Sequence, residues 1–308
     1  MPASGTAKLA GTGGVSYPTG VDSLPSPNLS VTLVDDIGPE TDWSGILQDV
    51  DAVVHLAARV HMIQELAPNL YTLYQQMNVD ATRRLAEQSE AAGVHRFVFL
   101  SSIGVHGAIN RGQPCSEKSH PAPYNHYTQS KWQAEQLLQQ IATESAMQVT
   151  VLRPPLVYGP RVPANFLALM RLVDRGIPLP LGAVQNQRSL IYLGNLVSAI
   201  QHCLEHPDAD GQTFVVSDGD DVSTPELIRR LARALGKPAR LLPVSTCWLL
   251  AAARLTGKMA TLERLTGSLL VDSRHIRQEL SWQPPFTMDE GLVETARWFR
   301  LAQAKGAN

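Results

Sequence analysis

A tyrosine and a lysine stand four positions apart in the chain, at Tyr127 and Lys131. The residues that follow, 130–146, have helical composition, and their apolar side chains recur at roughly helical spacing. Residues four apart lie on one face of a helix, so the ammonium of Lys131 is expected beside the phenol of Tyr127. A neighbouring cation favours the phenolate and lowers the pKa of the phenol toward neutrality. A phenol tuned in this way can exchange a proton with an alcohol or sugar hydroxyl.

A serine upstream extends this pattern. Ser102 follows the apolar run RFVFL at residues 96–100, which is typical of a buried parallel strand, and it precedes Tyr127 by 25 positions. A tyrosine four residues before a lysine is, by itself, more often a packed ring beside a solvated ammonium. The serine at a strand end, with strands and helices alternating on both sides, favours an oxidoreductase-type site.

The rest of the chain supplies the elements that position these residues. Strands are expected at residues 30–34, 51–57, 97–102 and 148–153, with helices at 70–92 and after Tyr127. This alternation predicts an α/β fold with a Rossmann-like, doubly wound parallel sheet. Beyond residue 160 the pattern loosens, although Ser223 and Glu226 form a capping box before a helix. A last helix at 288–304 is expected to turn Leu292, Ala296 and Phe299 toward the core.

Residues 1–29 differ from everything that follows. They are rich in Gly, Ser, Thr and Pro, and their apolar residues are isolated. Gly11, Gly13 and Gly14 resemble part of a phosphate loop, but no strand is recognisable before them, and Pro18 and Gly20 interrupt any helix after them. We therefore expect an irregular leader over residues 1–29, in place of the first strand–loop–helix unit of the sheet.

Composition limits the classes of partner. The 308 residues are 44% hydrophobic and 18% charged, and the formal charge of −2 comes without long runs of one sign, so no nucleic-acid or membrane partner is indicated. The longest apolar stretch is far shorter than the roughly 20 residues that span a bilayer. No basic region followed by an apolar one opens the sequence, so no signal peptide is expected. Three widely separated cysteines suit a reducing cytoplasm. The histidines match no metal-ligand spacing, so no metal is expected, and a buried, locally satisfied role is predicted for His55.

The chain resembles the extended short-chain dehydrogenases/reductases, and among these the NAD-dependent nucleotide-sugar epimerases and dehydratases. The resemblance runs from about residue 30 to the C-terminus and is greatest to the UDP-hexose 4-epimerases of bacterial surface-polysaccharide pathways. The segments that carry it are Asp36-Ile37, His55 to Ala58, Asn78-Val79, Ser101-Ser102, Tyr127 with Lys131, Arg153 to Gly159, Asn165-Phe166 and Arg188.

The resemblance implies roles for individual residues. The implied catalytic residues are Ser102, Tyr127 and Lys131, acting with NAD as cofactor. Those implied to bind or support the cofactor are Asp36, Ile37, Leu56, Ala57, Ala58, Asn78, Tyr127, Lys131 and Pro154. Those implied to hold the nucleotide-diphosphate sugar, a UDP-hexose, are Ser102, Asn165 and Arg188. Asparagine is disfavoured inside helices, so its position at 78 within the expected 70–92 helix predicts a buried hydrogen-bonding role for Asn78. Arg188 suits a diphosphate because its planar fork donates twice to phosphate oxygens.

The family pattern also implies an organisation. Residues 30–160 are expected to form the dinucleotide-binding domain, and 161–308 mainly a substrate-binding lobe interleaved with it. A homodimer through the Tyr127 helix and the 70–92 helix is implied. Dehydratases of the family carry an Asp-Glu pair shortly after the serine; Ile103 and Gly104 stand there, which favours epimerisation through a 4-keto sugar.

Two alternatives stay open from the sequence. One is a reductase or dehydrogenase of the same superfamily that uses NADPH, since the residue that would select the cofactor is not recognisable. The other is a non-catalytic remnant that binds NAD weakly, because a phosphate loop and its helix N-terminus supply much of the binding of a pyrophosphate.

Overall fold

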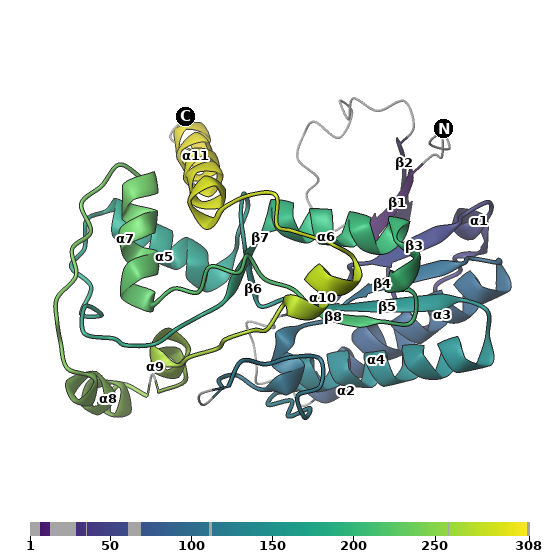
Figure 1. The fold of residues 1–308 in the computed structure, drawn as a ribbon, viewed down its shortest axis with the longest axis horizontal. Coiled ribbons are helices and arrows are strands. Elements are labelled where there is room, and N and C mark those ends of the chain that lie inside the picture. Colours follow the sequence, from purple (N-terminus) through teal and green to yellow (C-terminus); the bar gives the residue numbers. More distant parts are fainter. Residues whose placement is uncertain are drawn as a thin grey trace. The chain divides into compact units, whose positions relative to one another are not determined.

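The computed structural model describes residues 7–12, 29–34, 36–60, 69–110, 113–257 and 259–306 (Figure 1). The chain forms two compact units, and each is described by itself. The first contains Met1–Leu100 and Asn125–Val151, and the second contains Ser101–Tyr124 and Leu152–Asn308. The units interleave along the sequence. Residues 101–124 and 152–160 belong to the second unit, whereas the sequence predicted that the first domain extends to residue 160.

Parallel strands form the frame of the first unit. Strand β1, Ala7–Thr12, pairs in parallel with β2, Leu29–Val34. Strand β3, Ala52–His55, pairs in parallel with β4, Arg96–Leu100, in the register Ala52 to Arg96. Strand β5, Gln148–Arg153, is the other neighbour of β4; it belongs to both units, and β8, Thr213–Val215, follows it in the sheet. Parallel strands alternating with helices confirm the predicted α/β class.

Strand β1 corrects the prediction for the N-terminal segment. An irregular leader was expected over residues 1–29, yet Ala7–Thr12 is a strand whose six residues all pair with β2. Its sequence, AKLAGT, has no β-branched residue before its last position, so local propensity gives no signal, and the pairing partner decides the conformation. Strands β1 and β2 thus form a two-stranded parallel sheet, and β1 lies within the segment that was expected to be irregular. Gly13 and Gly14 of the candidate phosphate loop lie outside the described residues.

The helices of the first unit pack on this frame. They are α1 (Ser44–Leu47), α2 (Leu70–Tyr74), the π-helical stretch η2 (Gln75–Asp80), α3 (Ala81–Ala91) and α4 (His126–Glu144). Helices α3 and α4 lie side by side (Figure 1). Their buried residues, such as Leu85 and Leu138, share one core with Phe97 and Phe99 of β4, both of which are fully buried.

Helix α4 begins where the sequence predicts. The side chain of Asn125 accepts a hydrogen bond from the backbone N–H of Thr128 (2.8 Å), and the Thr128 hydroxyl oxygen accepts one from the N–H of Asn125 (3.2 Å). This reciprocal cap satisfies two donors at the helix start. Tyr127 therefore stands in the first turn of α4 and Lys131 in the second.

The second unit contains the remaining elements. Its strands besides β8 are β6 (Leu156–Tyr158) and β7 (Leu190–Tyr192), which pair in parallel. Its short 3-10 helices are η3 (Ile103–His106) and η4 (Pro207–Ala209). Its α-helices are α5 (Ala164–Asp174), α6 (Leu193–Glu205), α7 (Thr224–Ala234), α8 (Thr246–Leu255), α9 (Met259–Thr266), α10 (Arg274–Glu279) and α11 (Met288–Gly306).

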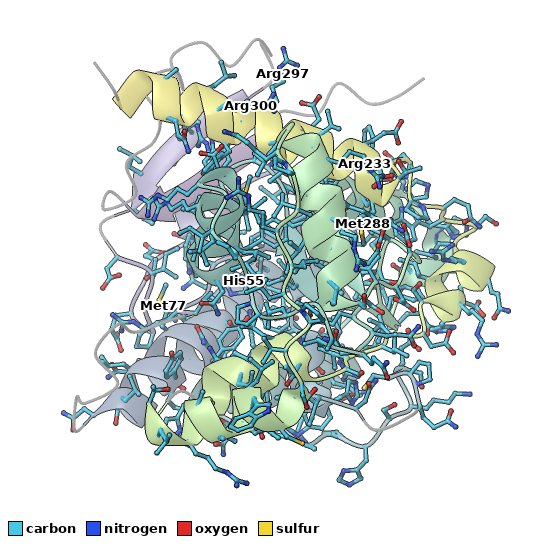
Figure 2. All side chains as sticks on the ribbon, turned by 90° about the vertical axis from the view of Figure 1, so that its left-hand side faces the viewer. His55, Met77, Arg233, Met288, Arg297 and Arg300 are labelled. Carbon is cyan, nitrogen blue, oxygen red and sulfur yellow. The ribbon has the colours of Figure 1, made fainter. Side chains whose placement is uncertain are left out.

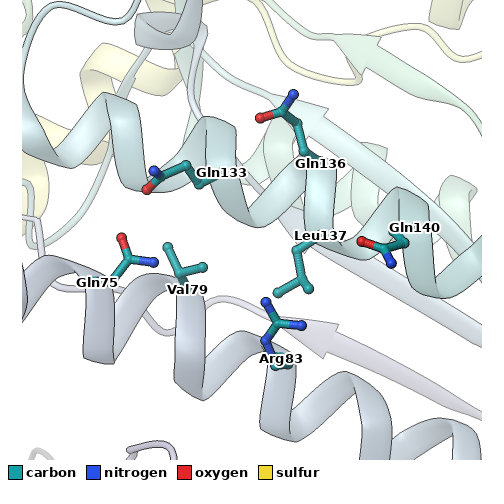
Figure 3. A pocket seen from close by; sticks show the side chains of 7 residues that line it. All are labelled: Gln75, Val79, Arg83, Gln133, Gln136, Leu137 and Gln140. Atoms are coloured by element: carbon teal, nitrogen blue, oxygen red, sulfur yellow. The ribbon is translucent and has the colours of Figure 1, made fainter.

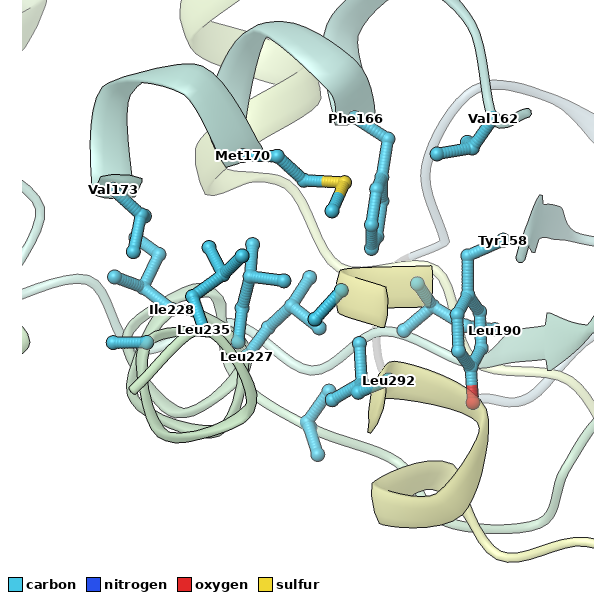
Figure 4. Close-up of a cluster of buried hydrophobic side chains, with 14 of the residues drawn as sticks. Tyr158, Val162, Phe166, Met170, Val173, Leu190, Leu227, Ile228, Leu235 and Leu292 are labelled. Carbon is cyan, nitrogen blue, oxygen red and sulfur yellow. The ribbon is translucent and has the colours of Figure 1, made fainter. Parts of the chain in front are cut away.

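A second apolar core lies between these helices (Figure 4). It joins Phe166 and Met170 of α5, Ile228 of α7 and Leu292 of α11, none more than 4% exposed. The predicted apolar face of the last helix is confirmed, since Leu292, Ala296 and Phe299 are all buried. Helix α11 also contacts α7 through polar groups, because Arg300 donates to the Ala234 carbonyl at 3.3 Å (Figure 2).

A buried carboxylate holds the strands of this unit to its helices. Asp218 accepts hydrogen bonds from the Tyr158 hydroxyl (2.8 Å), the backbone N–H of Tyr192 (2.8 Å) and the Asn195 amide (2.7 Å). Burial raises the pKa of Asp218, while these three donors act in the opposite direction. One carboxylate thus fixes β6, β7 and α6 in register.

Candidate active site

Ser102 lies two residues beyond the end of β4. Its Oγ accepts a hydrogen bond from the backbone N–H of Gly104 (3.1 Å), which makes Ser102 the N-cap of η3. The N–H of Ser101 donates to the Leu152 carbonyl (2.8 Å) and that of Ile103 to the Pro154 carbonyl (2.9 Å). The serine side chain is half-buried and its backbone is held on both sides. Ser102 belongs to the second unit, whereas Tyr127 and Lys131 belong to the first.

Lys131 is a buried cation. Its side chain is 2% exposed, its Nζ donates to the Leu100 carbonyl at the end of β4 (2.7 Å), and it lies 4.3 Å from the centroid of the Phe99 ring. Burial lowers the pKa of Lys131 to about 7, and the nearby charge of Glu135 acts against that shift. The amine one helical turn beyond Tyr127 can therefore gain or lose a proton near neutral pH.

Asn78 links the segment after β3 to the turn of α4 that carries Tyr127 and Ser130. This residue lies in η2 and is 1% exposed. Its Oδ1 accepts from the N–H of Arg59 (2.8 Å), and its Nδ2 donates to the Arg59 carbonyl (3.0 Å) and to Ser130 Oγ (2.9 Å). Ser130 in turn donates to the Tyr127 carbonyl (2.8 Å). The predicted buried hydrogen-bonding role of Asn78 is confirmed, and π-helical stretches are frequent at functional sites.

Ser130 is the residue of this network that sequence reasoning missed. A serine at a buried position between Tyr127 and Lys131 was the available signal, because a buried hydroxyl requires a partner. Its hydrogen bond from Asn78 ties the turn that carries both site residues to η2.

His55 ends β3 as a neutral, buried ring (Figure 2). Its Nε2 lies 2.9 Å from the Thr82 hydroxyl, and that hydroxyl donates to the Asn78 carbonyl (2.9 Å). The Thr82 oxygen therefore accepts from His55, whose proton is on Nε2. Burial, and then the charge of Lys131, lower the pKa of His55 to about 3. The prediction of a locally satisfied histidine is confirmed.

The residues proposed to bind the cofactor follow parallel strands. Asp36 and Ile37 follow β2; Asp36 is exposed and Ile37 is buried, and Asp35 lies outside the described residues. Leu56 directly follows β3 and is 55% exposed despite being apolar. Open parallel sheets bind their ligands at these carboxyl ends of strands.

The two residues expected to hold the substrate lie in the second unit. Asn165 is exposed in the first turn of α5. Arg188 donates through Nη1 to the carbonyls of Arg264 (2.7 Å) and Gly267 (3.1 Å), and burial lowers its pKa. One nitrogen of its guanidinium thus caps the C-terminal end of α9. Because Nη1 is engaged in this cap, the predicted binding of a diphosphate would use the other N–H groups of the Arg188 guanidinium.

The described ranges hold no cluster of three or more His, Cys, Asp or Glu side chains suited to a metal ion. Among the helices of the described residues, none has the length and hydropathy needed to cross a bilayer.

Comparison with known proteins decides the family. Residues 19–217 match the model of the NAD dependent epimerase/dehydratase family. The chain belongs to this family. It is 45% identical over 271 residues to the UDP-glucose 4-epimerase of Vibrio cholerae, covering 87% of this chain and 83% of that protein. It is 27% identical over 284 residues to an N-acetyl-alpha-D-glucosaminyl-diphospho-ditrans,octacis-undecaprenol 4-epimerase of Escherichia coli O157:H7, with the same coverage of 87% and 83%.

Solved structures of the family share the fold. The UDP-glucose 4-epimerase of Thermotoga maritima with UDP-glucose superposes with a TM-score of 0.72 at 21% identity, covering 96% of this chain and 99% of that chain. The UDP-glucuronic acid 4-epimerase of Bacillus cereus in complex with NAD gives 0.69 at 21% identity, covering 88% and 81%. Family membership confirms the predicted NAD-dependent enzyme class.

The residues of the first unit fit the NAD of this family. Leu56 offers an exposed apolar surface at the carboxyl end of a parallel strand, suited to a flat ring system. The Lys131 ammonium has three donors, and in the described part of the chain it makes one hydrogen bond, to Leu100.

Proposed function

We propose that this enzyme interconverts UDP-hexoses by epimerisation at C4. The observation that carries the proposal is the buried Lys131 one turn beyond Tyr127 on α4, in a chain that is 45% identical to a UDP-glucose 4-epimerase over most of its length. Burying an ammonium lowers the stability of the folded chain. A functional role beside the phenol of Tyr127 accounts for a lysine at this buried position.

The proposed chemistry assigns one task to each residue. Tyr127 as phenolate removes the proton from the C4 hydroxyl, and Ser102 orients that hydroxyl by a hydrogen bond. Lys131 stabilises the phenolate charge, and its ammonium would also hold the ribose of the cofactor. NAD, when bound, supplies the acceptor and donor of the hydride. After the 4-keto sugar turns over, Tyr127 returns the proton to the C4 oxygen, so no net oxidation remains.

Further residues would hold the cofactor and the substrate. Asp36 would accept from the adenine amine, and the small side chains of Ala57 and Ala58 would let the backbone approach the cofactor, with Pro154 near the nicotinamide. Asn78 would act through the segment after β3, because its amide contacts Arg59 and Ser130. The remaining donors of Arg188, with Asn165, would bind the UDP moiety.

Chromatographic separation of UDP-sugars tests the proposal. Purified enzyme should convert UDP-glucose into UDP-galactose and the reverse without consuming added NADH or NADPH. The variants Tyr127→Phe and Ser102→Ala should each lower kcat by about 100-fold or more, the contribution expected of proton transfer. Tyr71→Phe, on an exposed tyrosine of α2, is the matched control and should keep full activity. Stoichiometric NADPH oxidation without interconversion would support the reductase instead.

A homodimer is proposed through the face of η2, α3 and α4. A groove of about 360 Å³ runs along this face (Figure 3), lined by Gln75, Val79, Arg83, Gln133, Gln136, Leu137 and Gln140. The amide oxygens of Gln75 and Gln133 are buried there and have no hydrogen-bond partner among the described residues. The proposal follows the family resemblance, in which these helices form the dimer contact, and the amide groups that line the groove offer donors and acceptors to a second copy of the chain.

Compartment and pathway follow as parts of the same proposal. A cytoplasmic enzyme is supported by cysteines that are all free thiols, at Cys115, Cys203 and Cys247. A UDP-hexose product would serve glycosyl transfer into surface polysaccharide. Fractionation of cells that express the tagged chain tests the compartment.

A further inference from the structure

The segment that carries Ser102 is fixed at four places in the second unit. Three are backbone hydrogen bonds, from Ser101 and Ile103 to the 152–154 segment and from Ala122 to the Val105 carbonyl (2.8 Å). The fourth is a side-chain contact at the far end of η3, where His106 Nε2 lies 2.9 Å from Arg153 Nη1. Both side chains are buried, His106 at 8% and Arg153 at 5% exposure.

The chemistry of this pair defines the state of the histidine. A guanidinium has only donors, so His106 Nε2 must accept, and the ring proton must be on Nδ1. Nδ1 lies 3.4 Å from the His120 carbonyl, which is the acceptor on that side. Burial, and then the charge of Arg153, lower the pKa of His106 to about 4, so the ring is neutral and able to accept at neutral pH.

We propose that His106 is a positioning residue for Ser102: its imidazole, held between the Arg153 guanidinium and the His120 carbonyl, fixes the end of η3 and thereby the direction of the Ser102 hydroxyl. The inference rests on the proposed function, in which Ser102 orients the C4 hydroxyl of the sugar. It assigns His106 no contact with substrate and no proton transfer.

The geometry explains why a side chain is needed there. Helix η3 is a single short turn from Ile103 to His106, and 3-10 turns have weak hydrogen-bond geometry. Beyond it, Gly107 has φ of +120°, so the chain turns sharply at once. A turn this short transmits any rotation of its end to its N-cap. Because catalysis depends on the orientation of reacting groups, a small displacement of Ser102 should lower kcat more than it changes KM.

Variants at His106 test this role. His106→Leu removes the acceptor for Arg153, whereas the amide oxygen of His106→Gln can replace it. We expect His106→Leu to lower kcat by about 10- to 100-fold with KM changed less than about threefold, and His106→Gln to recover most of the loss. His120→Leu, on an exposed side chain of the same loop, is the matched control and should retain activity, because the contact with His106 uses the backbone carbonyl of His120. The His120 ring, whose Nδ1 lies 2.7 Å from the Pro121 carbonyl, takes no part in that contact.

A double-mutant cycle shows whether the effect passes through the serine. In a Ser102→Ala background, His106→Leu should lower kcat by less than about threefold further, since the group that it orients is gone. An equal loss in both backgrounds, or no rescue by Gln, would overturn the proposal. Should the Leu variant not fold, His106→Asn replaces it, because this shorter amide does not reach Arg153.

Hydrogen exchange separates this proposal from the proposed function. Amide protons of residues 103–106 should exchange faster in His106→Leu than in the wild type, while those of α7 should not change. If the wild type interconverts no UDP-hexose, the proposed function fails, and the exchange data still decide on the positioning contact. Unchanged exchange at residues 103–106 would contradict it.

Discussion

Replacing Lys131 by methionine should make the protein more stable while it abolishes activity. Burial lowers the pKa of Lys131 from 10.5 to about 7. The unfolded chain therefore binds this proton more tightly than the folded chain between these two pH values. The penalty on folding is complete below pH 7, declines as pH rises from 7 toward 10.5, and is absent above. Methionine has similar length and no charge, so it removes the penalty.

The magnitude follows from the same two values. Each pH unit corresponds to 1.36 kcal/mol, so the penalty is roughly 5 kcal/mol below pH 7 and roughly 2 kcal/mol at pH 9. Methionine also loses the hydrogen bond from the ammonium to the Leu100 carbonyl, worth roughly 2 kcal/mol. The attraction of Glu135 is already part of the lowered pKa of Lys131 and adds no further loss. The variant should thus be more stable than the wild type by roughly 3 kcal/mol at pH 6 and equal to it at pH 9.

Urea unfolding of the cofactor-free protein at both pH values measures this difference. Lys118→Met, on an exposed lysine, is the matched control and should differ little from the wild type at either pH. Epimerase activity of the Lys131 variant should fall by about 100-fold or more. The reasoning is refuted if the Lys131 variant is less stable at pH 6, or if its advantage is as large at pH 9 as at pH 6.

Three further predictions concern other contacts. Asp218→Asn should lower the free energy of unfolding by roughly 2–4 kcal/mol in urea, because an amide group then faces three donors; unchanged stability would contradict the role of this carboxylate. Ser130→Ala should lower kcat by about tenfold with little change in folding, whereas Ser130→Thr should keep activity; loss of folding without an effect on kcat would show a structural role only. Leu137→Glu, in the groove, should convert the proposed dimer into a monomer as measured by light scattering. Gln129→Glu, on an exposed residue of the same helix, should leave the dimer intact. A monomeric wild type would contradict the proposed interface.

The helix that carries Tyr127 and Lys131 could be predicted from sequence because its determinants are local. The cap at Asn125 and the helical composition after it lie within a few residues of Tyr127 and Lys131, so the helix start and the spacing were both accessible. The start of α7 at the Ser223 cap and the buried face of α11 were also predictable, since capping residues and helical periodicity are short-range signals.

Features that depend on distant partners could not be read in this way. Strand β1 forms because β2 pairs with it, although AKLAGT has little strand propensity. Arg188 was expected to bind phosphate, and its capping of α9 involves Arg264 and Gly267, more than 70 positions away. The contact of His106 with Arg153 likewise joins two segments that only the fold brings together.

The π-helical stretch η2 has a consequence for comparing this chain with its relatives. A π-turn holds one more residue than an α-turn, so removing one residue from Gln75–Asp80 would restore a regular helix. The wider turn accommodates the extra residue, so after the deletion the helix beyond it would keep Leu85 in the core. Within the stretch the side chains would change position, and the hydrogen bond from Asn78 to Ser130 would be lost. A single-residue gap in this stretch therefore marks homologues that lack the hydrogen bond from Asn78 to Ser130, the residue whose hydroxyl donates to the Tyr127 carbonyl. In those homologues other contacts must hold the turn that carries the tyrosine.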